Sequence, residues 1–191
     1  MRRLQWEQKF RRGFTMIEVV TVMTIVALMM AIVAPRFRIS EAMEVQLAAR
    51  QLAQDLDFAR ARALATRASV RVSFESNPAA YAGYLDDNDD GTISESDDER
   101  IALRGFGHRE LSDRLEYARG SVPEVSGVAS GGAISFSDSR VDFDSRGLVT
   151  PMGASGAVYI RHKAKPEHVA AVAVTAAGNV RIWTWHEGQW K

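Results

Sequence analysis

The strongest candidate for chemistry is an acidic stretch in the middle of the chain, DDNDDGTISESDDE, from Asp86 to Glu99. Its oxygen-bearing residues follow the spacing of a twelve-residue calcium loop with Gly91 at the sixth position: Asp86, Asn88, Asp90, Thr92, Ser94 and Asp97. The last position holds Asp97 instead of the longer glutamate of an EF-hand, and the flanks are typical of strands. Two alternatives stay open: a calcium site, or a solvated acidic loop that needs no metal.

No other group of polar residues predicts catalysis. His162 and His168 flank an expected turn without a third ligand and are predicted to lie on the surface, while Asp142 and Asp144 are more typical of a polar strand face than of an acid–base pair. The chain has no cysteine, which excludes thiol catalysis and cysteine-ligated metals, and it has no nucleophile elbow, Walker loop or dinucleotide fingerprint. The sequence predicts no enzyme and no cofactor, apart from the calcium alternative.

A single acid interrupts the most apolar segment of the chain. Residues 16–34 read MIEVVTVMTIVALMMAIVA, with Glu18 as the one charge, and their length is close to the roughly 20 residues that cross a bilayer as a helix. Basic residues precede the segment, so the positive-inside bias predicts a cytoplasmic N-terminus. The run is too long for a secretory signal peptide, and a plain signal anchor does not explain an acid in the membrane. Glu18 is therefore expected to have a partner.

The residues around this acid, RRGFTMIEVV, resemble the type III signal of type IV pilins and type II secretion pseudopilins. In that family a prepilin peptidase cleaves after the glycine, here Gly13, and methylates the new N-terminus, here Phe14. The resemblance implies that residues 1–13 are a cleaved basic leader and that Glu18 pairs with the Phe14 amine of a neighbouring subunit during assembly. It also implies that Pro35 is the family's helix-kinking proline.

Beyond the apolar segment, the helical pattern continues with one apolar stripe, formed by Val45, Ala49, Leu52, Leu56, Ala59 and Ala63. The simplest structure is one long helix, with residues 14–35 as its transmembrane and assembly segment and residues 36–67 as an amphipathic continuation. The charged residues off the stripe, Arg60 among them, are expected to form a solvated face.

From residue 68 to residue 191 the sequence predicts an antiparallel β domain. Val70, Val72 and Phe74 alternate with polar residues, which is typical of a strand with one buried face. Further strands are predicted at AYAGYL, RIALRGF, AISF, RVDFDS, AVYIRH, VAAVAVT and NVRIWTW. The acidic loop 86–99 and the Gly- and Ser-rich loop 118–132 are expected to be exposed. The predicted fold class is α+β, a pilin-like long N-terminal helix packed on a C-terminal antiparallel β domain.

Two segments of the C-terminal half, VDFDSRGLV and VAVTAAGNVRIW, resemble the paired strand–glycine turn–strand segments of H-type pseudopilins and FimT-like minor pilins. The resemblance implies a minor pseudopilin of a type II protein secretion system, assembled near the tip of the pseudopilus. The alternative is a FimT-like minor type IV pilin in pilus assembly or DNA uptake. The implied partners are the prepilin peptidase, other pseudopilin or pilin subunits and the inner-membrane assembly platform. The implied location is the bacterial inner membrane, with a periplasmic C-terminal domain, and then the pseudopilus or pilus.

Nucleic-acid binding is the less favoured function. Without the five basic residues and one acid of residues 1–13, the chain carries 19 basic and 23 acidic side chains, which argues against a broadly basic surface. Trp183 and Trp185 share one strand face near Trp190. They are expected in the core if that face points inward, and they would form a surface for bases or a partner protein if it points outward.

Overall fold

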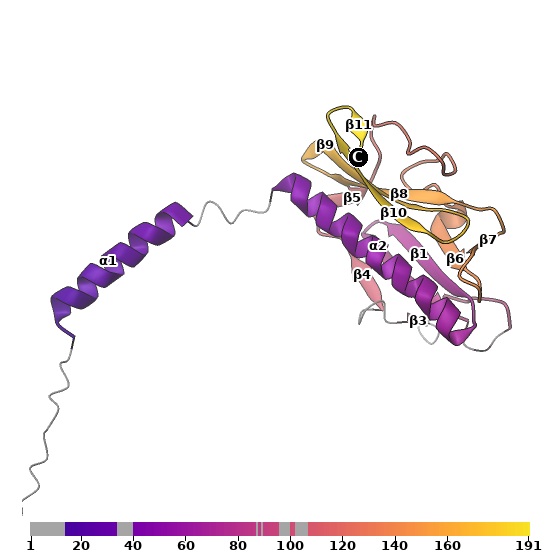
Figure 1. Cartoon of the computed structure of the whole chain (residues 1–191), viewed down its shortest axis with the longest axis horizontal. Coiled ribbons are helices and arrows are strands. Elements are labelled where there is room, and N and C mark those ends of the chain that lie inside the picture. The colour runs from indigo at the N-terminus through magenta and orange to yellow at the C-terminus, as the bar shows by residue number, and fades with distance from the viewer. Residues whose placement is uncertain (1–13, 34–39, 87, 89, 96–99, 102–106) are drawn as a thin grey trace, which may run out of the picture. The chain divides into compact units, whose positions relative to one another are not determined.

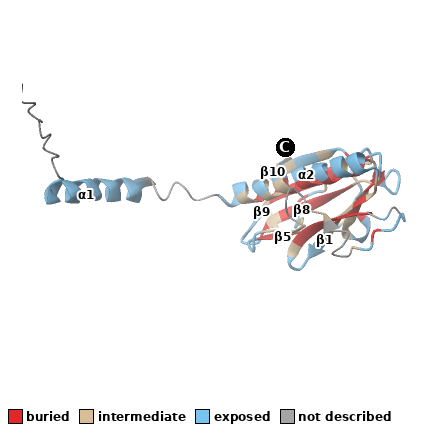
Figure 2. Cartoon of the chain, turned by 90° about the horizontal axis from the view of Figure 1, so that it is seen from below, coloured by how far each residue is buried: buried red, intermediate tan, exposed pale blue. Residues whose placement is uncertain are grey.

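The computed structural model describes residues 14–33, 40–86, 88, 90–95, 100–101 and 107–191 (Figure 1). The chain divides into two units, Met1–Ile39 and Ser40–Lys191. In the first unit, helix α1 spans Met16–Val33. The side chains of its residues 16–32 are exposed (Figure 2), including Met16, Met23 and Leu28. Among the described residues, no helix combines the length and the apolar character needed to cross a membrane.

The second unit begins with helix α2, Glu41–Thr66. Ser40 is in an extended conformation, and its hydroxyl accepts a hydrogen bond from the amide of Met43 at 3.3 Å, as an N-cap does. The prediction of one uninterrupted helix is therefore wrong at Ser40. The backbone of Ser40 is not helical, and its hydroxyl accepts the Met43 amide in place of a carbonyl from a preceding helical turn. Pro35 lies outside the described residues. The predicted apolar stripe of α2 is confirmed, and all six of its residues are buried.

The β elements form two antiparallel sheets. The first sheet has the order β3-β2-β1-β6-β7, and β4 also pairs with β2. Its strands are β1 Val70–Ser76, β2 Ala79–Leu85, β3 Arg100–Ile101, β4 His108–Glu110, β6 Arg140–Phe143 and β7 Val149–Thr150. The second sheet has the order β11-β10-β9-β8-β5. Its strands are β5 Leu115–Tyr117, β8 Gly156–His162, β9 Lys165–Val174, β10 Val180–His186 and β11 Gln189–Trp190.

Most of the predicted strands are confirmed, and the fold is α+β as predicted. The side chains of Val70, Val72 and Phe74 point inward, as the alternation predicts. Strand β1 pairs with β2 so that Phe74 lies opposite Tyr81. The predicted strand AISF is wrong: only Ile134 forms an isolated bridge, to Val158, and a short 3-10 helix, Ser137–Ser139, follows. Main-chain hydrogen bonds still join Ala133 and Ser135 to Tyr159 and Ala157 of β8, and the 3-10 helix then ends the pairing.

The second unit, Ser40–Lys191, is the globular unit of the chain, and two large hydrophobic clusters of its described residues, among three in all, hold it together. The main core lies between α2 and the inner faces of both sheets and includes Leu56 and Phe143. A second cluster lies on the other face of the second sheet and includes Tyr159 and Ala171. Strands β8 and β9 are therefore buried on both faces, which explains their nearly continuous apolar sequences.

The loop 118–132 covers this second cluster. Most of its glycines and serines are exposed as predicted, but Val122 and Val125 are buried in the cluster, so the prediction is wrong at these two residues. These two valines are isolated among glycines and serines, so the sequence does not show that they are buried. They are buried because the outer face of the second sheet is apolar.

Candidate functional site

The first candidate site is the start of α1, where the sequence places processing and assembly. Gly13 lies outside the described residues, and Phe14 is 82% exposed. The Thr15 hydroxyl accepts a hydrogen bond from the amide of Glu18 at 3.3 Å, and the Thr15 carbonyl accepts one from Val19 at 3.2 Å. Thr15 thus caps the helix and places Glu18 in its first turn, with the spacing of a capping box and with its charge near the positive end of the helix dipole.

Glu18 is the only ionisable side chain of α1. The two other polar side chains of the helix are satisfied within it, because the hydroxyls of Thr21 and Thr24 donate to the carbonyls of Ile17 and Val20, at 2.7 and 2.8 Å. Glu18 is exposed and forms no ion pair with any described residue. The carboxylate is therefore the one group of α1 that needs a partner from outside the helix.

The second site is Arg60 on α2, which the sequence placed on a solvated face. This prediction is wrong. The Arg60 guanidinium donates to the carbonyls of Gly147 and Ala177, both at 3.0 Å, and to the side chain of Asn179 at 3.3 Å. It ties together the two glycine turns that carry the pseudopilin resemblance. A Cβ atom added at Gly178, where φ is +76°, would lie 2.2 Å from the Gly147 carbonyl oxygen, so the turns approach too closely for a side chain.

The third site is Asp55, a carboxylate that is 1% exposed in the apolar stripe of α2. Its Oδ2 accepts a hydrogen bond from the Tyr81 hydroxyl at 2.7 Å and lies 2.9 Å from Nε of Arg109. Burial and the hydrogen bond to Asp55 raise the pKa of Tyr81 well above its usual range. This cluster was not predicted from the sequence. Its available signal was an acid three residues after Leu52, on the buried face.

The acidic loop folds as a compact turn that brings several of its predicted ligands together. Asp86 is 2% exposed, and its Oδ2 accepts a hydrogen bond from the amide of Gly91 at 3.0 Å. The side chains of Asn88 and Asp90 accept hydrogen bonds from the amides of Asp90 and Thr92, at 3.1 and 2.7 Å. Ser94 is exposed, and Asp97 lies outside the described residues.

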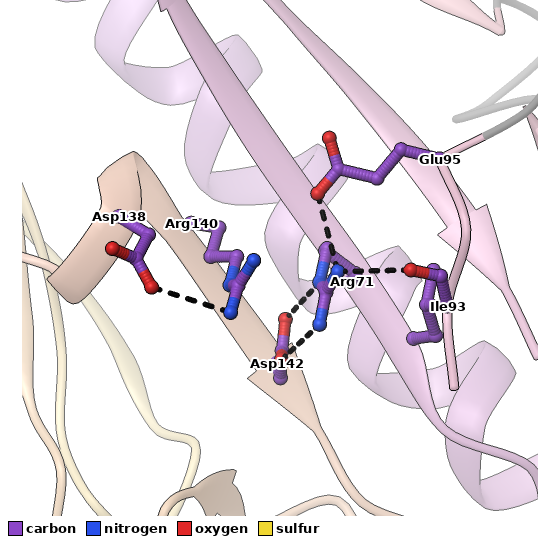
Figure 3. Close-up of polar contacts among 6 residues, drawn as sticks. All are labelled: Arg71, Ile93, Glu95, Asp138, Arg140 and Asp142. Carbon is purple, nitrogen blue, oxygen red and sulfur yellow. Dashed lines mark hydrogen bonds and ion pairs between the residues drawn. The ribbon is translucent and has the colours of Figure 1, made fainter. Parts of the chain in front are cut away.

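Ile93 and Glu95 of this loop are attached to the outer face of the first sheet. Ile93 is buried against Ala82 and Tyr84. The Arg71 guanidinium donates to the Ile93 carbonyl at 3.1 Å and contacts Glu95 at 3.2 Å, and it also binds both oxygens of Asp142, at 2.8 and 2.9 Å (Figure 3).

Asp142 and Asp144, the possible acid–base pair, have structural roles. Asp142 holds Arg71, and the Asp144 side chain accepts hydrogen bonds from the amides of Arg146 and Leu148, both at 2.9 Å. The two acids therefore hold an arginine and a turn, which is consistent with the predicted polar face and not with an acid–base pair.

The histidines form no metal centre in the described part of the chain, where no three His, Cys, Asp or Glu side chains are placed to hold an ion. His162, predicted on the surface, is 4% exposed. Its Nδ1 accepts a hydrogen bond from the amide of Ala164 at 3.2 Å, and its Nε2 lies 3.8 Å from Glu44. The prediction failed because the short β8–β9 turn folds the ring under α2, which the sequence around His162 does not reveal.

The C-terminal tryptophans cover the second cluster. Trp183, Trp185 and Trp190 are half-buried against it, which corresponds to neither the main core nor a free surface. The rings of Trp185 and Trp190 are 5.3 Å apart, and the indole nitrogen of Trp190 donates to the carbonyl of Pro123 at 2.9 Å. These side chains fasten the loop 118–132 to the sheet.

Comparison with known proteins places these features in one family. A family model described as type II transport protein GspH matches residues 48–178, and a model of the prokaryotic N-terminal methylation motif matches residues 8–34. No curated protein matches the chain. The minor pseudopilin EpsH from the type II secretion system of Vibrio cholerae is a similar solved structure, with a TM-score of 0.51 and 17% identity over 78% of this chain and 100% of that chain. The type IV minor pilin FimU of Pseudomonas aeruginosa has a TM-score of 0.49 and 16% identity over 78% of this chain and 92% of that chain, a likeness too weak to argue from.

The two family models divide the chain as its structure does. The GspH model falls on the globular unit and spans more than half of the chain, whereas the methylation motif spans residues 8–34, which include α1. The likeness to EpsH supports the pilin-like fold. The chain therefore belongs to the GspH family of type II transport proteins, which confirms the family and the type II secretion function predicted from its sequence.

Proposed function

We propose that this chain is cleaved between Gly13 and Phe14, methylated at Phe14, and assembled through α1 into the pseudopilus near its tip. In this proposal it has a structural role and no catalytic one, and its partners are the prepilin peptidase, other pseudopilin subunits and the inner-membrane platform. The observation that carries the proposal is a helix that exposes its apolar side chains while its one acid has no ionic partner among the described residues.

The membrane part of the proposal rests on α1 and its flanks. Before assembly, the exposed apolar side chains of this helix need an apolar surrounding, and the basic residues that precede it favour a cytoplasmic N-terminus. The anchor would consist of α1 together with adjacent residues, since 18 helical residues extend about 27 Å and the hydrocarbon core is about 30 Å thick. The globular unit would then lie in the periplasm.

The assembly part rests on the charge of Glu18. Cleavage after Gly13 would create a cation at Phe14, and a neighbouring subunit could present that amine to the carboxylate. Two unit charges 4 Å apart attract by about 1 kcal/mol in water but by about 4 kcal/mol at an effective dielectric constant of 20. The same pair would therefore contribute much more among packed helices than in solution, and it would offset the cost of an acid in the membrane.

Processing is tested by mass spectrometry of the N-terminus after expression with the prepilin peptidase. We expect a chain that begins with N-methylated Phe14. Gly13→Ala should leave the leader attached, whereas the control Gly132→Ala should be processed normally, because a Cβ atom at Gly132 meets nothing within 4 Å. Normal cleavage of Gly13→Ala would contradict the proposed processing site.

Assembly is tested separately by cross-linking the processed chain to the other pseudopilins in membranes. Glu18→Val should be cleaved but should lose most of its cross-links, since its partner amine is left without a carboxylate. The matched control is Glu167→Val, which removes an exposed acid of the globular unit. Full incorporation of Glu18→Val would show that the ion pair does not drive assembly.

The described part of the globular unit offers no specific support for the DNA-uptake alternative. The tryptophans that could stack on bases are half-buried and pack against the second cluster instead. A gel shift at low salt, where phosphate contacts are strongest, tests this alternative directly.

A further inference from the structure

We propose that the start of the acidic loop binds a calcium ion through Asp86, with Asn88, Asp90 and the main-chain carbonyl of Thr92 as further oxygen ligands. This site is independent of processing and of assembly through α1. The sequence pattern alone suggested this site. The structure adds that the Asp86 carboxylate is buried and that one of its oxygens accepts no hydrogen bond from the described residues.

Asp86 is a buried acid that lacks a counter-charge among the described residues. Its side chain is 2% exposed and forms no ion pair with them. One oxygen, Oδ2, accepts the amide of Gly91, while Oδ1 is buried and accepts no hydrogen bond from the described part of the chain. The hydrogen bond from Gly91 to Oδ2 places the carboxylate beside the turn that carries Asn88 and Asp90. A buried carboxylate oxygen without a partner is costly, and a cation within the loop would remove that cost.

The neighbouring side chains supply the oxygen atoms that calcium prefers. Asn88 and Asp90 are exposed and linked to each other, since the Asn88 amide donates to Oδ2 of Asp90 at 2.9 Å. Carbonyl and carboxylate oxygens have two lone pairs each, so an oxygen that accepts a loop amide can still bind a cation. A set of oxygen donors without nitrogen or sulfur favours calcium over zinc or copper, and water molecules would complete the coordination.

The sheet holds the start of this loop and its middle, at Ile93. At its start, the amide of Asp86 donates to the carbonyl of Ser69 at 3.0 Å. Two residues after Gly91, Ile93 is buried, and its carbonyl accepts a hydrogen bond from Arg71 (Figure 3). The other contacts of Arg71 among the described residues go to Asp142 and Glu95, so this arginine does not neutralise Asp86. The strand flanks therefore do not argue against a calcium site, because they order the turn before any ion arrives.

The test is calorimetric titration of calcium chloride into the purified full chain in detergent, after removal of metals with a chelator. We expect one calcium per chain, and at least a tenfold weaker affinity for Asp86→Asn and Asp90→Asn. Asp86→Asn keeps the volume and an acceptor for the Gly91 amide. Asp90→Asn changes an exposed residue, so it tests the site even if the first variant folds poorly. The control Asp113→Asn, an exposed acid outside the loop, should bind calcium like the unmodified chain.

Thermal unfolding gives a second readout. Calcium should raise the melting temperature of the unmodified chain and of Asp113→Asn, but not that of the two loop variants, because only a ligand of the folded state stabilises it. Magnesium should act more weakly, since it demands a tighter octahedral site. No heat at millimolar calcium would overturn the proposal, as would undiminished binding by both loop variants. Either result would leave the proposed processing and assembly unaffected.

Discussion

Helices α1 and α2 are both rich in apolar residues, but they find different surroundings. In α1 the apolar side chains are exposed around the whole helix, whereas α2 buries one stripe in the main core and exposes its other face (Figure 2). Each helix also carries one notable acid. Asp55 of α2 is buried beside Tyr81 and Arg109, and Glu18 of α1 is exposed without an ionic partner among the described residues.

The contrast separates folding from assembly. A helix whose stripe is covered by its own chain contributes to the stability of that chain, and a helix whose apolar surface is uncovered contributes only when lipid or another subunit covers it. Equivalent substitutions in the two helices should therefore have different consequences. The following predictions use such pairs, measured as the free energy of unfolding of the globular unit in the full chain unless stated otherwise.

The largest effect is expected for an apolar truncation. Leu56→Ala removes a fully buried side chain of α2 and should lower the free energy of unfolding by about 2–5 kcal/mol. Leu28→Ala makes the same chemical change in α1, where the side chain is 62% exposed, and should change it by less than about 0.5 kcal/mol. Urea denaturation measures both. Equal losses would mean that α1 is part of the folded core.

The acids should differ in the same way. Asp55→Asn leaves Arg109 without its buried counter-charge and should cost about 1–3 kcal/mol in urea denaturation. Glu18→Gln should leave the stability of the globular unit unchanged and reduce cross-linking to other subunits instead. A stable Asp55→Asn variant would show that the cluster does not depend on charge.

A smaller loss of stability is expected in the C-terminal part of α2. Arg60→Ala removes the hydrogen bonds to Gly147, Ala177 and Asn179 and should cost about 1–2 kcal/mol, because these bonds come from a charged donor but are partly exposed. Arg62→Ala, an exposed arginine two residues further along, should stay within about 0.5 kcal/mol. If both variants shifted the melting temperature equally, the hydrogen bonds from Arg60 to the two turns would not contribute to stability.

The smallest effect is expected at the helix caps. Thr15→Ala and Ser40→Ala each remove a side-chain acceptor for an amide of the first turn and should weaken that turn by about 1 kcal/mol. Amide hydrogen exchange should speed up at Glu18 in the first variant and at Met43 in the second. Only Ser40→Ala should also lower the melting temperature of the globular unit, and a similar drop with Thr15→Ala would contradict the separation of the two helices.

The amino-acid sequence by itself determined the local features of this protein. The spacing of RRGFTMIE predicted the processing motif, a period of four and three predicted the buried stripe of α2, and a period of two predicted β1. The glycine turns were also predictable, because Gly147 and Gly178 adopt positive φ angles that glycine tolerates best. These features depend on neighbours within a few residues, so the order of the residues contains them.

Only the tertiary structure decided which distant residues meet. Arg60 binds a carbonyl 87 residues away, and Val125 is bonded through its amide to the hydroxyl of Tyr159, 34 residues away. The burial of His162, the cluster around Asp55 and the attachment of the acidic loop by Arg71 likewise depend on how α2 and the two sheets are placed. The physical reason is that periodicity shows which face of an element is apolar, whereas the partner of that face is chosen by packing across the whole unit.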